Sequence, residues 1–87
     1  MHKDLQKELI VYRLNDLLAE VYKDYELSLI VNVDFQGKPF ENFEGIKSVG
    51  LFKGKNLINY IDIKDDTPEK VFLRLSEIIY KTLEANK

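Results

Sequence analysis

The chain has 87 residues, a formal net charge of −2 and no cysteine. This length predicts one small domain, residues 1–87, and a hydrophobic content of 45% is too high for a disordered chain. Without cysteine, neither a disulfide nor a thiolate metal site can form, so packing must stabilise the fold. No apolar run reaches transmembrane length, and Met1-His2-Lys3-Asp4 begins no signal peptide, so we expect a cytoplasmic protein.

Residues 2–24 predict a long helix, because they contain neither glycine nor proline and are rich in good helix formers. The expected core stripe consists of Ile10, Leu14, Leu17, Leu18, Val21 and Tyr25, flanked by Val11 and Tyr22. Leu5, Leu9 and Tyr12 fall on nearly the opposite side, while Lys3 and Lys7 take the core direction in the first turns. Either these turns cross a loop or a sheet edge, or fray, or the three apolar residues meet another chain.

Residues 27–35 alternate between apolar and polar side chains, which predicts a strand with one buried face. Ile30 interrupts the polar positions, so the other face is covered by part of the first helix or left open for a partner. Gln36-Gly37-Lys38-Pro39 is typical of a turn. Phe40 and Phe43 follow it, and they either fold back over the rim of the core or form a partner-binding tip.

Residues 46–53 and 57–63 predict a hairpin with Gly54-Lys55 as its turn. The expected register places Phe52 opposite Leu57, Leu51 opposite Ile58, Val49 opposite Tyr60, Ser48 opposite Ile61, Lys47 opposite Asp62 and Ile46 opposite Ile63. Both faces of this hairpin are then partly apolar. Either each helix covers a different face, or the second face docks on a partner.

Asp65-Asp66-Thr67-Pro68-Glu69 predicts a helix start, with Thr67 as the N-cap and Pro68 as the first helical residue. The helix is expected to run to about Glu84. Its expected buried stripe consists of Val71, Phe72, Leu75, Ile78, Ile79 and Leu83. Leu73 and Tyr80 share the back of this helix, as Leu5, Leu9 and Tyr12 do on the first. Two such groups favour self-association or partner docking.

These elements predict a single α+β domain of order α-β-β-β-α, with a three-stranded antiparallel sheet packed against two helices. This order resembles that of the double-stranded RNA-binding domain. That family carries a basic cluster at the start of its last helix, whereas residues 65–70 here are mostly acidic. The resemblance therefore argues against this mode of RNA binding, and fold order alone does not carry function.

The residues that would support catalysis are scarce. His2 is the only histidine and lies at the terminus, and Ser28, Ser48 and Ser76 have no well-placed histidine to activate them. Asp62, Asp65 and Asp66 lack the spacing of a calcium loop. We therefore expect no enzyme, no metal, no cofactor and no small-molecule substrate.

The sequence favours a small non-enzymatic protein-binding module. Its candidate partner-binding residues are Leu5, Leu9, Tyr12, Phe40, Phe43, Leu73 and Tyr80. In composition and element order the chain resembles bacteriophage accessory and inhibitor proteins. That resemblance implies a nucleic-acid-handling partner whose basic surface would meet Glu41, Glu44, Asp65 and Asp66.

Two alternatives stay open. One is a nucleic-acid-binding module that uses the Lys53/Lys55 hairpin tip with Lys38 and Lys64, although the mixed charge and only two arginines make nucleic acid the less favoured partner. The other is a homodimeric structural protein.

Overall fold

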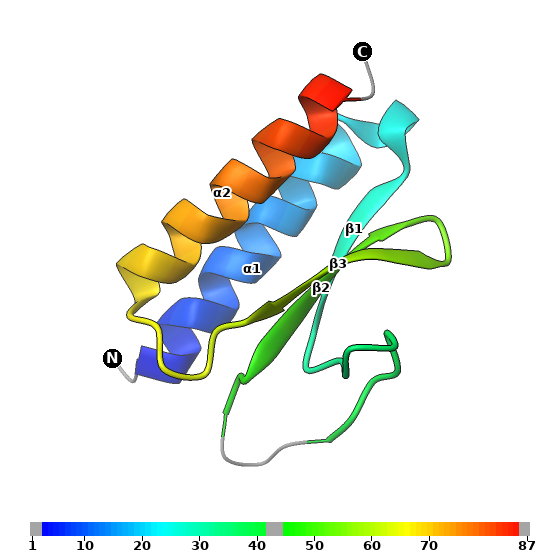
Figure 1. The fold of residues 1–87 in the computed structure, drawn as a ribbon. Helices are drawn as coiled ribbons and strands as arrows, with labels where there is room; N and C mark the ends of the chain where they lie inside the picture. The colour runs from blue at the N-terminus through cyan, green and yellow to red at the C-terminus, as the bar shows by residue number, and fades with distance from the viewer. Residues whose placement is uncertain (1–2, 42–44, 86–87) are drawn as a thin grey trace.

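The computed structural model describes residues 3–41 and 45–85, which form two α-helices and one three-stranded sheet (Figure 1). In chain order the elements are α1 Lys3–Glu20, the 3-10 helix η1 Lys23–Tyr25, β1 Leu27–Val31, β2 Ser48–Lys53, β3 Asn56–Asp62 and α2 Pro68–Ala85. The sheet is antiparallel with strand order β1-β2-β3. The predicted α+β class and element order are therefore confirmed.

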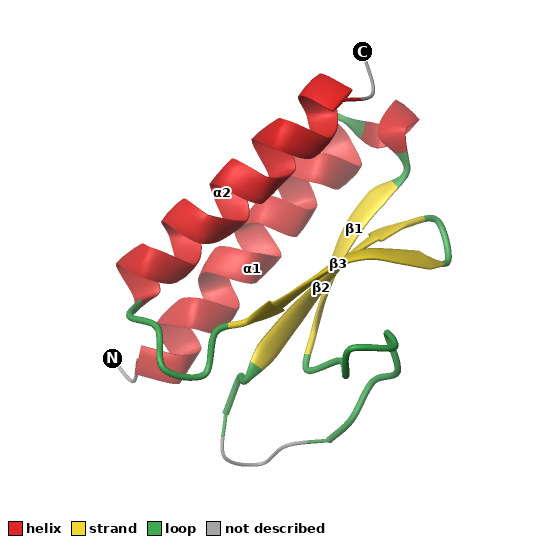
Figure 2. Cartoon of the chain, viewed as in Figure 1, coloured by secondary structure: helices red, strands yellow, loops and turns green. Residues whose placement is uncertain are grey.

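Both helices lie on the same face of the sheet, side by side and running in the same direction (Figures 1 and 2). The alternative in which each helix covers a different face is therefore wrong. The core lies between helices and sheet and consists of Val11, Leu18, Leu27, Leu29, Ile46, Val49, Leu51, Ile61, Ile63, Val71, Leu75 and Ile79. The predicted N-cap of α2 is confirmed, because the Lys70 N–H donates to Thr67 Oγ1 at 3.2 Å.

The strand predicted over residues 27–35 ends at Val31, because Asn32 adopts a left-handed φ of 56°. Two hydrogen bonds of the Asn32 side-chain amide stabilise this bend. Its Oδ1 accepts from the Lys47 backbone N–H at 2.7 Å, and its Nδ2 donates to the Gly45 carbonyl at 3.2 Å. Val33 stays buried, but Phe35 is 75% exposed instead of lying on the buried face.

A β-bulge corrects the predicted hairpin register. Phe52 lies opposite Leu57 as expected, but Leu51 lies opposite Asn59, which leaves Ile58 as the extra residue on β3. Beyond the bulge Val49 faces Ile61 and Ser48 faces Asp62. Leu57 and Ile61 would share a face in a regular strand, and the bulge sends them to opposite faces. The bulge reverses the alternation of side chains along β3, so apolar side chains of this strand lie on both faces of the hairpin.

The loop after β1 covers the middle of the sheet face that the helices leave open. Val33 is fully buried there and meets Phe52 and Leu57 around Gly50. A Cβ on Gly50 would approach Val33 Cγ2 to 2.7 Å and Phe52 Cε1 to 2.8 Å. Only glycine leaves room for the loop to close against β2.

Lys7 takes the core direction in the first turns of α1 because its cation binds backbone carbonyl groups. The side chain is 5% exposed, and its Nζ donates to the carbonyl oxygens of Ile63 at 3.2 Å and Lys64 at 3.3 Å. The first turns of α1 therefore lie against the connection from β3 to α2. Lys7 satisfies carbonyl groups there that an apolar residue would leave without this donor.

Replacing Lys7 by methionine should lower the free energy of unfolding by about 1–3 kcal/mol, because the carbonyl oxygens lose a charged donor while the apolar stem is kept. Urea unfolding followed by circular dichroism measures this change. Lys70→Met, at an exposed position on α2, is the matched control and should stay within about 0.5 kcal/mol of the wild type. Equal stability of the two variants would show that Lys7 does not hold this connection.

Gly50→Ala should destabilise the fold by about 1–3 kcal/mol, because the added methyl group overpacks the cluster around Val33. Val33→Ala removes the nearest clashing atom, so its cost should be smaller in the Gly50→Ala background than in the wild type. A double-mutant cycle of urea unfolding tests this coupling. If the losses of unfolding free energy from the two substitutions simply add, the loop does not contact the methyl group introduced at position 50.

Candidate protein-binding surface

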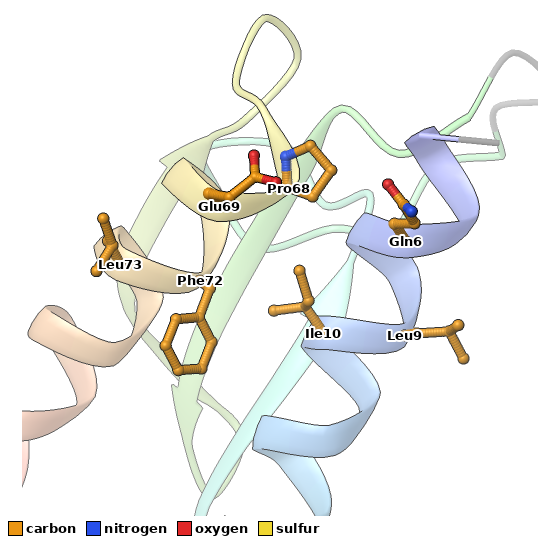
Figure 3. A pocket seen from close by; sticks show the side chains of 7 residues that line it. All are labelled: Gln6, Leu9, Ile10, Pro68, Glu69, Phe72 and Leu73. Atoms are coloured by element: carbon orange, nitrogen blue, oxygen red, sulfur yellow. The ribbon is translucent and has the colours of Figure 1, made fainter. Parts of the chain in front are cut away.

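A groove runs along the outer side of the helix pair. One part, an open hollow of ≈ 570 Å³, is lined by Gln6, Leu9 and Ile10 from α1 and by Pro68, Glu69, Phe72 and Leu73 from α2 (Figure 3). Ile10 and Phe72 lie between the two helices, with Leu9 and Leu73 on either side (Figure 3). The adjoining part is lined by Leu9, Ile10, Arg13, Leu14, Leu17 and Phe72. We call these two parts together the helix groove.

The groove forms because the helices carry more apolar side chains than the core accommodates. Val11 and Leu18 of α1 are fully buried against the sheet, whereas Leu17 is 44% and Val21 62% exposed. On α2, Phe72 is 48% exposed. The prediction that these three residues are buried is wrong, because α1 faces the sheet along Lys7, Val11 and Leu18, which leaves Leu17 and Phe72 at the outer margin of the helix contact.

The structure brings together some of the predicted partner-binding residues. Leu9 and Leu73 both line the helix groove, from different helices. Tyr12 lines a neighbouring hollow with Leu9, Arg13, Asp16, Leu17 and Glu20. Leu5 and Tyr80 are also exposed on the helices, at 46% and 64%. Sequence reasoning missed Leu17 and Phe72, and the signal available was the surplus of apolar residues around α1.

The predicted aromatic tip lies elsewhere. Phe40 is 40% exposed and sits on the loop after β1, where its N–H donates to the Asn32 carbonyl at 2.9 Å. It is not part of the helix groove, and Phe43 lies outside the described residues.

The same loop presents Phe35 on a hydrogen-bonded turn. Asp34 Oδ1 accepts from the backbone N–H groups of Lys38 at 3.0 Å and Gln36 at 2.8 Å. These bonds, that from Lys38 foremost, lower the pKa of the Asp34 carboxyl because they favour its charged form. Phe35 is thus an exposed aromatic residue on a separate surface.

The charges beside the helix groove are mostly acidic. Asp16, Glu20 and Glu69 line the groove or the neighbouring hollow, with Arg13 as the cation among them. Within the described part of the chain, none of these four side chains makes an ion pair. The surface therefore has uncompensated negative charge available to a partner.

Several charged and phenolic groups on or beside the helices are already engaged. Asp66 pairs with Arg74, and Glu77 pairs with Lys81 at 2.9 Å, which lowers the pKa of the Glu77 carboxyl. The Tyr12 hydroxyl donates to Glu8 Oε1 at 3.0 Å, and this bond raises the pKa of the Tyr12 phenol.

Lys64 lies apart from the lysines at the hairpin tip that are proposed with it for nucleic-acid binding. Lys53 and Lys55 lie at the hairpin tip, and Lys64 lies past the opposite end of β3. Glu26 also approaches the tip, with Oε2 3.8 Å from the position a Cβ on Gly54 would take. The tip is therefore a surface of mixed charge.

Residues 3–41 and 45–85 make up the described part of the chain. In these ranges no group of three or more histidine, cysteine, aspartate or glutamate side chains is placed to hold a metal ion. Neither α1 nor α2 has the length and apolar character that crossing a membrane requires.

Comparisons with protein-family models, curated proteins and solved structures found no significant match to this chain.

Proposed function

We propose that the chain is a non-catalytic protein-binding module whose partner docks in the helix groove. The observation that carries this proposal is the exposure of apolar side chains from both helices along one groove: Leu9 at 42%, Leu17 at 44%, Phe72 at 48% and Leu73 at 65%. Contiguous apolar surface of this kind costs free energy in water and commonly marks an interface. Tyr12 lines the neighbouring hollow and can supply amphipathic contacts at the rim.

The shape and chemistry of the groove favour a protein over other ligands. A small-molecule site normally encloses most of its ligand and places a few polar groups around it, whereas this groove is open and largely apolar. Nucleic acid needs clustered cations, whereas the described residues that line the groove include one cation, Arg13, and one acid, Glu69. An apolar protein surface that packs on the helices would fit a groove that is open and apolar and that lacks clustered cations.

Leu73→Asp and Leu9→Asp should each reduce capture of the partner about tenfold or more, since a buried charge at an interface centre removes roughly 2 kcal/mol of binding. The measurement is quantitative mass spectrometry of proteins retained from source-cell lysate by the immobilised chain. Phe35→Asp adds the same charge at an exposed apolar position on another surface and should leave capture unchanged. Circular dichroism checks that all three variants fold.

Two outcomes would contradict the proposal. Capture that survives Leu73→Asp and Leu9→Asp, or that falls equally in Phe35→Asp, would place the interface elsewhere. Sedimentation velocity supplies the second check: a concentration-dependent dimer that Leu73→Asp dissociates would make the groove a contact between two copies of this chain, as in the homodimer alternative.

A further inference from the structure

We propose that the occupant of the helix groove is a single amphipathic α-helix whose apolar stripe is flanked by lysine or arginine and which lies antiparallel to α1 and α2. This inference rests on the proposed function and narrows it to one class of partner. Three observations carry it: the walls of the groove, the charges beside it, and the direction of the two helices.

The walls favour a helix over an extended peptide. Both sides of the groove are helices of 18 residues, about 27 Å long at 1.5 Å per residue, whose backbone groups are bonded within the helices. An extended peptide would bring unpaired N–H and C=O groups against Leu9, Ile10 and Phe72, which offer no partners. A helix satisfies its own backbone and can pack its ridge of side chains between α1 and α2.

The charges favour a basic partner. Glu69 lines the groove itself, and Asp16 and Glu20 line the hollow that adjoins it along α1, where Arg13 is the cation; none of these side chains makes an ion pair in the described residues. Lysine or arginine on both flanks of an apolar stripe would meet these carboxylates. A second copy of the chain presents the same excess of acid on this surface, so it complements the groove poorly.

The helix direction sets the orientation of the occupant. Because α1 and α2 run the same way, the partial negative charges of their C-terminal ends lie at the same end of the layer (Figure 1). Neither helix has a basic residue in its last turn. An antiparallel occupant would bring its partly positive N-terminal end there, beside Glu20 at the end of α1 and Val21 after it.

The test uses the intact chain and synthetic helical peptides of about 18 residues, the length of α1. Three peptides are compared: a leucine stripe flanked by lysines, the same stripe flanked by glutamates, and the lysine peptide with its leucines replaced by serines. Nitrogen–proton NMR titration of the chain measures affinity and maps the contact. The lysine–leucine peptide should shift the amide signals of Leu9, Leu17, Phe72 and Leu73 and bind about tenfold or more tightly than either of the others.

Charge variants of the chain supply the matched control. The triple variant Asp16→Asn, Glu20→Gln and Glu69→Gln should lose most of its preference for lysine over glutamate flanks. A second triple variant, Glu26→Gln, Glu41→Gln and Asp65→Asn, removes exposed acids outside the groove and should keep that preference. A spin label on the N-terminus of the lysine peptide should broaden signals of Val21 and Tyr80, and one on its C-terminus those of Gln6 and Glu69.

Each contrary result overturns a stated part of the inference. Equal binding of the lysine and glutamate peptides, or equal effects of the two triple variants, would show that the partner need not be basic. If the N-terminal spin label broadens the signals of Gln6 and Glu69 instead, the occupant is not antiparallel to α1 and α2. Shifts confined to the hairpin tip or the loop after β1 place the helix elsewhere. If Leu73→Asp still abolishes partner capture while no peptide binds the groove, the proposed function stands and this inference fails; if capture also survives, both fail.

Discussion

Packing of both helices against one face of the sheet is the constraint on which the rest of the structure depends. The shared core of α1, α2 and the three strands satisfies that face with residues such as Val11, Leu51 and Leu75, all fully buried. It also creates two surfaces that the regular elements do not cover. One is the opposite face of the sheet, and the other is the outer side of the helix layer. The loop after β1 packs on the opposite sheet face, whereas no described segment packs on the outer side of the helix layer. This difference supports the proposed function.

The middle of the opposite sheet face is covered by local irregularities, whereas Ile30 and Tyr60, which pair with Gly50, stay 39% and 43% exposed. The bulge at Ile58 turns Leu57 away from the helices, and the left-handed Asn32 carries the chain back over the sheet so that Val33 packs above Gly50. The buried Ser48 hydroxyl secures this loop, since it accepts from the Val33 N–H at 3.1 Å and donates to the Val33 carbonyl at 2.6 Å. A second apolar cluster is thereby removed from water without a further helix.

The outer side of the helix layer has no such cover within the described residues. Leu9, Leu17, Phe72 and Leu73 remain between 42% and 65% exposed, beside carboxylates that have no ion-pair partners in that part of the chain. Scattered exposed leucines need no explanation, but apolar side chains from two helices along one groove are more than scatter. This is why we assign the interface to the helix layer rather than to the aromatic loop or the lysine tip.

Local signals in the sequence determined the element order, the cap at Thr67, the turn at Gly54-Lys55 and the pairing of Phe52 with Leu57, because each depends on residues close together in the chain. They also placed Leu5, Leu9, Tyr12, Leu73 and Tyr80 on the exposed sides of their helices. Tertiary structure decided the remainder. Periodicity assigns a residue to a side of a helix without showing how wide the buried stripe is, so it places Leu17, Val21 and Phe72 in the core although they lie exposed at its margin. Alternation along a strand carries no mark of a bulge, so the phase of β3 and the choice of face for Ile61 depended on contacts with residues far away in the chain.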